Sequence, residues 1–342
     1  MNHSPEIVIY GAGAIGGALG GWISPHYGRV SLLARGEHAA VMQSNGLILH
    51  SPKDKEIPQV VPVSVIDDLA QKPEADIVVL AVKNYDLEQA AIDIKAKLTR
   101  EPLIVAAQNG IENQDILPRY FSNIIYSVIC FSAWLEKPGT VCYLPGGALV
   151  LGTPHSPDEQ LRYSMQTVRN IFTLGIKTEI TDHFQDAMHC KLVMNLMNGL
   201  FSLTGVHVQN ISSMHTFKKL MAGTLLEGIE IVRKAGYKEV KLPRMPSWKT
   251  IRILGMLPNF VFRMFIRNML FDSTSQDILD RKKTISEIDT LNGYIVNMAD
   301  SLGIAAPYNR TIYRLAQTGF RNAAFKPLDV KVLWQNIQKA SS

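Results

Sequence analysis

The chain has 342 residues, of which 46% are hydrophobic, 19% charged and 8% aromatic. At about 150 residues per domain, this length predicts roughly two domains, and the composition excludes disordered and collagen-like proteins. The 35 basic and 30 acidic side chains give a formal charge of +5, without a run of five like charges that could form a nucleic-acid-binding tail.

The cysteines and the apolar segments indicate the cellular compartment of the protein. Cys130, Cys142 and Cys190 form no CxxC pair and are odd in number, which argues against a secreted disulfide framework and a zinc site. The polar amino terminus lacks the features of a signal peptide. Residues 251–271 are mostly apolar but are interrupted by Pro258, Arg263 and Arg267, which predicts an amphipathic helix instead of a membrane span. We therefore expect a cytoplasmic protein with no metal, no membrane partner and no nucleic-acid partner.

The first half of the chain alternates between short apolar runs and helical segments. The runs at residues 7–10, 30–33, 77–82, 103–107 and 124–129 suit strands buried on both faces, and residues 14–23 and 87–98 suit helices between them. This order predicts an α/β domain with a parallel sheet. Residues 140–144 and 148–151 flank Pro145-Gly146-Gly147 and predict a hairpin at the sheet edge.

The second half is predicted to be all-α. Residues 182–203, 214–235 and 286–302 carry apolar residues at three- and four-residue spacing, and Gly236 follows a basic helix end as a stop signal. The change of pattern near residues 175–185 divides the chain into a domain of residues 1–180 and a domain of residues 181–342.

A glycine-rich loop follows the first predicted strand. Gly11, Ala12, Gly13, Ala14, Ile15 and Gly16 match GxGxxG directly between a strand and a helix. The first glycine permits the turn, the second admits a pyrophosphate, and the third lets helix and strand pack closely. This context predicts a dinucleotide-binding Rossmann domain, although a glycine-rich turn without a ligand is the alternative.

The residue after the second strand indicates the cofactor. An NAD enzyme places an acid here, whereas this chain has Arg35 after residues 30–33. A guanidinium pairs well with a phosphate, which favours NADP. The alternative is that Arg35 is a solvated loop residue.

A polar stripe interrupts the apolar segment 190–198. Lys191 and Asn195 lie four residues apart and Asn198 three further on, so all three share one helix face. The stripe either lines a wet cavity or lies at an exposed edge with Lys191 reaching water. Glu287 and Asp289 are, taken alone, acids at the start of a helix.

Together these motifs resemble the ketopantoate reductase (2-dehydropantoate 2-reductase) family over nearly the whole chain. The matches are GxGxxG, Ala34-Arg35-Gly36, Ala81-Val82-Lys83, Gln108-Asn109-Gly110, Pro138-Gly139-Thr140-Val141, Lys191 to Asn195, Ser273 with Gln276-Asp277, and Glu287-Ile288-Asp289 with Leu291-Asn292-Gly293. The resemblance implies a Rossmann domain followed by an all-α domain, with NADPH and a branched 2-oxo acid in the cleft between them. It implies reduction of ketopantoate to (R)-pantoate, a step of pantothenate and coenzyme A biosynthesis.

The resemblance also implies a role for each matching residue. Lys191 becomes the catalytic lysine, oriented by Glu287, which also binds substrate or cofactor. The substrate contacts become Asn109, Asn195 and Ser273, together with Asn198 if it replaces the second asparagine of the family. Lys83 and Asn109 are expected near the cofactor, and Ala133 is expected to join the cofactor-binding residues.

Three hypotheses about the function remain open. The chain departs from the family pattern at Met197-Asn198-Gly199, around Ser273 and in the long segment 237–272. The alternatives to ketopantoate reduction are therefore a reaction on another 2-oxo acid or an amino acid derivative, and a non-catalytic NADP-binding sensor. We further hypothesise a homodimer, with the apolar stretch 254–271 as its contact.

Overall fold

The computed structural model describes residues 4–52, 58–206, 210–266, 287–322 and 324–341. It divides the chain into two compact units, Met1–Gln185 and Asp186–Ser342. The assignment of residues 1–180 to NADP and of residues 181–342 to the substrate stays a prediction.

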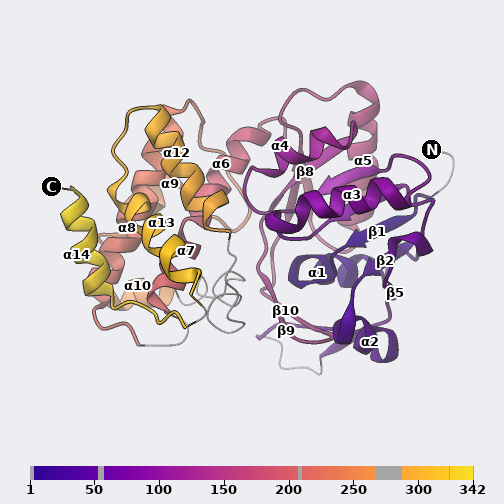
Figure 1. The fold of residues 1–342 in the computed structure, drawn as a ribbon, viewed down its shortest axis with the longest axis horizontal. Coiled ribbons are helices and arrows are strands. Elements are labelled where there is room, and N and C mark those ends of the chain that lie inside the picture. The colour runs from indigo at the N-terminus through magenta and orange to yellow at the C-terminus, as the bar shows by residue number, and fades with distance from the viewer. Residues whose placement is uncertain (1–3, 53–57, 207–209, 267–286, 323, 342) are drawn as a thin grey trace. The chain divides into compact units, whose positions relative to one another are not determined.

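An eight-stranded sheet forms the centre of the first unit (Figure 1). Its order is β12-β11-β8-β7-β6-β1-β2-β5, and all neighbouring strands are parallel except β8 and β11. The strand order reverses at β1 and β6, where a Rossmann-like sheet opens its ligand crevice. The strands are β1 (Ile7–Tyr10), β2 (Val30–Leu33), β5 (Ser64–Ile66), β6 (Ile77–Leu80), β7 (Leu103–Ala106), β8 (Ile124–Ile129), β11 (Leu149–Gly152) and β12 (Thr178–Ile180).

The central strands are buried along their whole length. Every residue of β1, β2, β6, β7 and β8 is buried, including Ser31 and Ser127, as their mainly apolar runs predicted. The connecting helices are α1 (Ala14–Ile23), α2 (Gly36–Asn45), α3 (Leu87–Lys97), α4 (Asn113–Ile116) and α5 (Glu159–Thr173), with short 3-10 turns η1 (Leu69–Gln71), η2 (Asn84–Asp86) and η3 (Leu117–Arg119). The predicted α/β fold is confirmed.

A second sheet in this unit was not predicted. Its order is β4-β3-β10-β9, formed by β4 (Gln59–Val61), β3 (Leu47–His50), β10 (Thr140–Tyr143) and β9 (Ala133–Lys137). Helix α1 packs between the two sheets, because Gly20 lies against Leu32 of β2 while Gly17 lies against Val141 of β10. The glycines of α1 therefore bring its backbone close to both sheets.

The predicted hairpin around Pro145-Gly146-Gly147 is wrong. β10 belongs to the small sheet and β11 to the large one, so the two strands do not pair. The reversal lies instead at the turn between β9 and β10, where Gly139 has a φ of 73°. After β10 in the small sheet, the chain continues through Gly147 to β11 in the large sheet. Gly147 has no side chain and so leaves room for Phe131.

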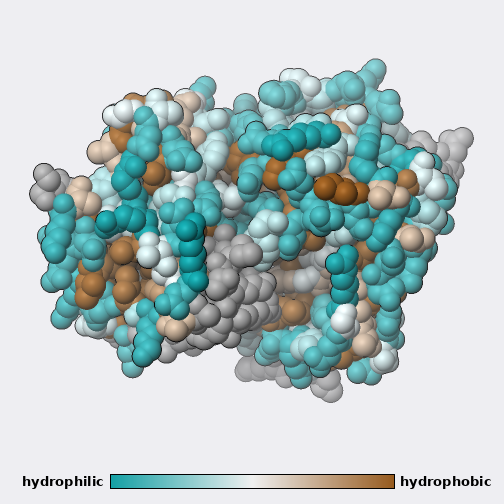
Figure 2. Space-filling view, in the orientation of Figure 1, coloured by the Kyte–Doolittle hydropathy of each residue, from teal (hydrophilic) through white to brown (hydrophobic). Residues whose placement is uncertain are grey.

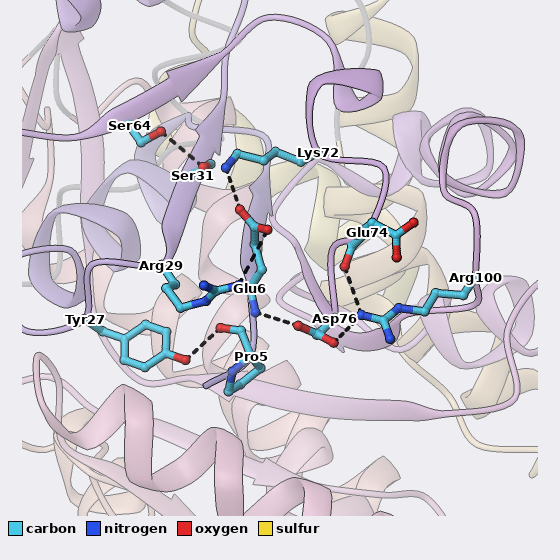
Figure 3. Close-up of polar contacts among 10 residues, drawn as sticks. All are labelled: Pro5, Glu6, Tyr27, Arg29, Ser31, Ser64, Lys72, Glu74, Asp76 and Arg100. Atoms are coloured by element: carbon cyan, nitrogen blue, oxygen red, sulfur yellow. Dashed lines mark hydrogen bonds and ion pairs between the residues drawn. The ribbon is translucent and has the colours of Figure 1, made fainter. Parts of the chain in front are cut away.

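A polar cluster ties β1 to its neighbours at the amino-terminal end of the sheet (Figure 3). The backbone N–H of Glu6 donates to Asp76 Oδ2 at 2.7 Å, and Arg100 donates to Asp76 Oδ1 at 2.6 Å. The Glu6 carboxylate accepts from Lys72 at 2.5 Å, and Tyr27 donates to the carbonyl of Pro5 at 2.7 Å. These contacts fix the amino ends of the strands and leave the carboxyl ends for a ligand.

The second unit is helical in its described residues. The segment predicted as one helix over residues 182–203 is interrupted at Leu196. The segment predicted as a helix over residues 286–302 forms a π-helix followed by an α-helix in its described part. The elements are α6 (Phe184–Asn195), α7 (Met197–Thr204), α8 (Met214–Lys234), α9 (Trp248–Leu254), α10 (Asn259–Ile266), the π-helix η5 (Asp289–Gly293), α12 (Tyr294–Ser301), α13 (Pro307–Phe320) and α14 (Val330–Ser341). Gly236, with a φ of 97°, follows the end of α8 as predicted.

The apolar stretch 251–271 contains two short helices in its described part. α9 ends at Leu254 and α10 begins just after Pro258, which separates them. In the described ranges of the chain, no helix is long and apolar enough to cross a membrane. The face drawn in Figure 2 is mostly hydrophilic, with apolar residues in small separate groups.

Candidate functional site

The glycine-rich loop joins the carboxyl end of β1 to α1. Gly11 has a φ of 101°, which glycine adopts without strain. The backbone N–H of Ala12 donates to the carbonyl of Leu33 at 3.0 Å, so the loop is held against the end of β2. Gly13 caps α1 without a side-chain hydrogen bond, and the first N–H groups of a helix have no partner within it. The loop therefore presents donors and a positive helix end.

The three motif glycines differ in the space around them. A Cβ built on Gly16 would lie 2.0 Å from the carbonyl oxygen of Gly11, and one on Gly11 would lie 2.9 Å from Val82 Cγ1. A Cβ on Gly13 would have no atom within 4 Å. Gly11 and Gly16 thus serve the packing of the loop, whereas Gly13 borders open space. A dinucleotide pyrophosphate fits this cradle.

A cavity of about 430 Å³ adjoins the loop. Four of the predicted cofactor residues line it: Gly11, Ala12, Gly13 and Arg35. Ala14, Ile15 and Gly16 lie in the first turn of α1. The cavity is lined by Tyr10, Gly11, Ala12, Gly13, Leu33, Ala34, Arg35, His38, Val82, Asp86, Gln89, Ala90 and Asp93.

Charges of both signs line this cavity. Arg35 is exposed and makes no hydrogen bond or ion pair within the described residues. Asp93 accepts from the Tyr10 hydroxyl at 2.7 Å and pairs with Lys97 at 2.8 Å, while Asp86 lies at the start of α3. Burial and the bond to Asp93 raise the pKa of Tyr10 to about 12. Arg35 is therefore the lining cation that remains available to an anion.

His38 connects the loop to the second sheet. The backbone N–H of Gly139 donates to His38 Nδ1 at 2.8 Å, so Nδ1 is the acceptor and Nε2 carries the hydrogen. Nε2 then donates to the carbonyl of Ala12 at 2.7 Å. No sequence motif indicates this contact, because His38 and Gly139 are 101 residues apart.

Lys83 and Asn109 lie at the carboxyl ends of two neighbouring strands. Lys83 follows β6 and Asn109 follows β7, and neither lines the cavity beside the loop. The Asn84 side chain donates to the carbonyl of Asn109 at 2.7 Å, and Gln108 donates to the carbonyl of Leu80 at 2.6 Å. Two buried amides thus hold the segment that presents Asn109.

Ala133 occupies a different place from the other predicted cofactor residues. It begins β9 in the small sheet, where it pairs with Tyr143 and is buried. It does not line the cavity beside the loop.

The predicted catalytic and substrate residues fall in the second unit. Lys191 and Asn195 lie one turn apart on α6, where Lys191 is half-buried and Asn195 is buried. Asn198 lies beyond the break at Leu196, in the first turn of α7, and is half-buried. Glu287 is only 4% exposed and immediately precedes Ile288 and the π-helix η5. Ser273 lies outside the described residues.

A second cavity, of about 560 Å³, borders α6 on the side of Cys190 and Met194. Its other walls come from residues 239–251, including Trp248 and Ile251. Burial raises the pKa of the Cys190 thiol to about 11, so this thiol stays protonated near neutral pH. Residues 239–251 therefore form a cavity beside the helix that carries Lys191, lined by apolar side chains together with Glu239 and Lys241.

Comparison with known families adds independent evidence. The family profile "Ketopantoate reductase PanE/ApbA" matches residues 7–156, and "Ketopantoate reductase PanE/ApbA C terminal" matches residues 183–319. A 2-dehydropantoate 2-reductase of Pyrococcus horikoshii is 25% identical over 314 residues, covering 91% of this chain and 96% of the relative.

Solved structures share the fold over nearly the full length. A PanE/ApbA family ketopantoate reductase from Ralstonia eutropha JMP134 superposes with a TM-score of 0.69 at 27% identity, covering 97% of this chain and 99% of the other. D-mandelate dehydrogenase with NADH and anilino(oxo)acetate superposes with a TM-score of 0.75 at 20% identity, covering 94% and 100%. At that identity, the second likeness concerns the fold alone.

Proposed function

Because the chain belongs to the ketopantoate reductase family of oxidoreductases, we propose that it reduces a 2-oxo acid to a 2-hydroxy acid, with ketopantoate as substrate and (R)-pantoate as product. The observation that carries this proposal is a polar set in the helical unit: the half-buried Lys191 and the buried Asn195 on α6, and the buried Glu287. Buried polar and charged side chains are costly, so their presence is explained by a reaction better than by binding alone.

In this proposal the dinucleotide is held by the glycine-rich loop. The helix end at Gly13 receives the pyrophosphate, and Arg35 receives the 2′-phosphate of NADP. Lys83 and Asn109 lie toward the nicotinamide end, and Ala133 keeps its predicted place among the cofactor residues. When bound, NADPH supplies a hydride to the C2 ketone. The alternative cofactor is NADH. Asp86 lines the same cavity and favours this alternative, because a carboxylate accepts hydrogen bonds from ribose hydroxyls.

The chemistry assigned to the chain is proton transfer and substrate positioning. The Lys191 ammonium stabilises the alkoxide that forms at C2 and donates the proton that completes the alcohol. Glu287 orients that ammonium, and Asn109, Asn195, Asn198 and Ser273 hold the substrate.

A second substrate class is favoured by the cavity beside α6. Met194, Trp248 and Ile251 line it, and Met194 immediately precedes Asn195 in the chain. A 2-oxo acid with a large apolar side chain is the substrate that such a surface would suit. D-mandelate dehydrogenase, a protein of the same fold, shows that the fold accepts substrates other than ketopantoate.

The test is a panel of 2-oxo acids of increasing side-chain size, each measured with NADPH and with NADH by the loss of absorbance of the reduced nicotinamide. Turnover of ketopantoate with NADPH above all other pairs supports the proposal. Higher kcat/KM with a bulky acid would replace ketopantoate by the second class. Binding of NADPH by fluorescence without oxidation by any acid would make the protein a sensor and refute the proposed reaction.

A further inference from the structure

A chain of buried hydrogen bonds runs through the helical unit from α8 to the break between α6 and α7. It starts at Glu227 on α8, whose carboxylate accepts from the backbone N–H groups of Tyr308 at 2.9 Å and Asn309 at 2.7 Å. The same carboxylate accepts from the Asn309 side chain at 2.8 Å. Glu227 therefore caps the first turn of α13 and fixes the orientation of the Asn309 amide.

The side-chain amide of Asn309, oriented in this way, is hydrogen-bonded to the side chain of Asn292. Both side chains are completely buried, with an exposed fraction of 0%. Asn309 Nδ2 also donates to the carbonyl of Thr224 at 3.1 Å, so its Oδ1 faces Asn292 and accepts from Asn292 Nδ2 at 3.1 Å. Since a carboxylate can only accept, Glu227 determines which end of the Asn309 amide points toward Asn292.

Asn292 joins two segments that carry proposed catalytic residues. Its Nδ2 donates at 3.3 Å to the carbonyl of Leu196, the residue that separates α6 from α7 and directly follows Asn195. Asn292 itself lies in η5, whose backbone is bonded to the segment before it: Leu291 N–H donates to the carbonyl of Glu287 at 3.1 Å. One side chain therefore links the end of the Lys191 helix to the segment of Glu287.

The packing around this link leaves it little freedom. A Cβ built on Gly199 of α7 would lie 2.6 Å from Asn292 Oδ1 and 2.8 Å from Ile288 Cδ1. The glycine thus lets η5 approach the backbone of α7 closely.

We propose that Asn292 is a positioning residue for the reduction, and that Asn309 and Glu227 hold it in place. By bonding to Leu196 it sets the direction in which α6 ends, and by its place in η5 it sets the position of Glu287 relative to α6. This inference rests on the proposed roles of Lys191 and Glu287. An interrupted helix and a π-helix are locally unfavourable, and a buried amide network is a specific way to hold both.

The test compares Asn292→Leu with Ile312→Val. Leucine has the branched shape and the same number of side-chain heavy atoms as asparagine, although it is bulkier, and it removes both donated hydrogen bonds. The Ile312 variant shortens a buried apolar neighbour of Gly199 without touching the network. We expect Asn292→Leu to lower kcat at least about tenfold and to shift the pH profile of kcat, with the Kd of NADPH changed less than twofold. Ile312→Val should lower the Tm but leave kcat and its pH profile as in the parent.

Glu227→Gln is the second variant, and it tests the network if Asn292→Leu does not fold. Glutamine keeps one oxygen acceptor but turns an amide N–H toward the donors of α13. We expect a smaller fall in kcat with the same shift of the pH profile, and a double variant no worse in kcat than Asn292→Leu alone. A folded Asn292→Leu or Glu227→Gln enzyme with the kcat and pH profile of the parent would overturn the positioning role.

Hydrogen exchange separates this inference from the proposed function. If the parent protein reduces no 2-oxo acid, the proposed function fails, and peptides covering residues 189–200 and 287–293 then report on the link itself. Faster amide exchange in both peptides of Asn292→Leu, but not in Ile312→Val, supports the link. Unchanged exchange in either peptide overturns it.

Discussion

Gly13→Ala should separate cofactor binding from folding more cleanly than any other change in the glycine-rich loop. Gly13 has a φ of −69°, which alanine adopts, and a Cβ there has no atom within 4 Å. In the proposed complex this open space is where the pyrophosphate approaches the backbone. The added methyl group should therefore collide with the cofactor and with nothing in the protein.

The expected magnitudes follow from this geometry. Replacing glycine by alanine at a compatible position stabilises a protein by about 0.4–1 kcal/mol through the unfolded chain, while losing glycine at an N-cap costs up to about 1 kcal/mol. The free energy of unfolding of Gly13→Ala should thus stay within about 0.5 kcal/mol of the parent. Gly16→Ala should lose about 1–3 kcal/mol, because its Cβ would lie 2.0 Å from the Gly11 carbonyl oxygen and the backbone must move.

Urea unfolding and NADPH fluorescence titration measure the two effects separately. We expect the Kd of NADPH to rise about 100-fold in Gly13→Ala, equivalent to about 2.7 kcal/mol of binding free energy. Gly28→Ala is the matched control, since Gly28 is exposed and a Cβ there also meets no atom within 4 Å. Parent-like affinity for both NADPH and NADH in Gly13→Ala would show that the pyrophosphate does not bind at this loop.

Three further predictions concern the proposed catalytic lysine, the cofactor phosphate and alkaline pH. Lys191→Ala should leave NADPH binding nearly intact and lower kcat about 100- to 10,000-fold. Glu287→Ala should lower kcat less and raise KM more, and the losses should be non-additive in the double variant. Near-parent turnover of Lys191→Ala would make Lys83 the next candidate for the proton donor. Arg35→Ala should weaken NADPH binding by about 1.5–3 kcal/mol and leave NADH nearly unchanged, and equal losses for both cofactors would refute a phosphate contact. The pKa of Tyr10 is raised to about 12, so folding favours its protonated form; the stability this contributes is complete below the usual tyrosine pKa near 10 and is lost as the pH rises through 12. Unfolding curves across this range should show a smaller loss of stability in Tyr10→Phe than in the parent, and identical slopes would contradict the raised pKa.

Much of the first unit was predictable because most strands of its large sheet are short, mainly apolar runs bounded by turns. The limits of β1, β2, β8 and α1 agree with the prediction residue for residue. The small sheet was missed because the apolar runs of two of its strands are very short: Leu47 to Leu49 in β3, and Val60 and Val61 in β4. Proline and glycine mark a change of direction, but they do not say whether the chain reverses or passes to another sheet, as it does at Gly147.

Helical periodicity likewise located the second unit but not its irregularities. The apolar spacing continues across Leu196, although the backbone is interrupted there and the Leu196 carbonyl accepts from the side chain of Asn292, 96 residues away. The π-helix η5 has no periodic signal of its own in the sequence. The motifs identified the proposed site residues one by one, while the residues that hold them, such as His38 and Asn84, depend on contacts between distant segments.

Two segments of the first unit each contribute a strand to both sheets: one contains β8 and β9, and the other contains β10 and β11. The segments pair with each other in both sheets, and backbone hydrogen bonds between Cys130 and Ala148 continue this pairing between the sheets. Neither sheet can then melt while the other keeps all of its strands, so the first unit should open as a single cooperative foldon. The slowest-exchanging amides of β1 and of β10 should accordingly share one opening free energy. The glycine-rich loop, bonded through His38 to the turn between β9 and β10, should lose its shape in the same event.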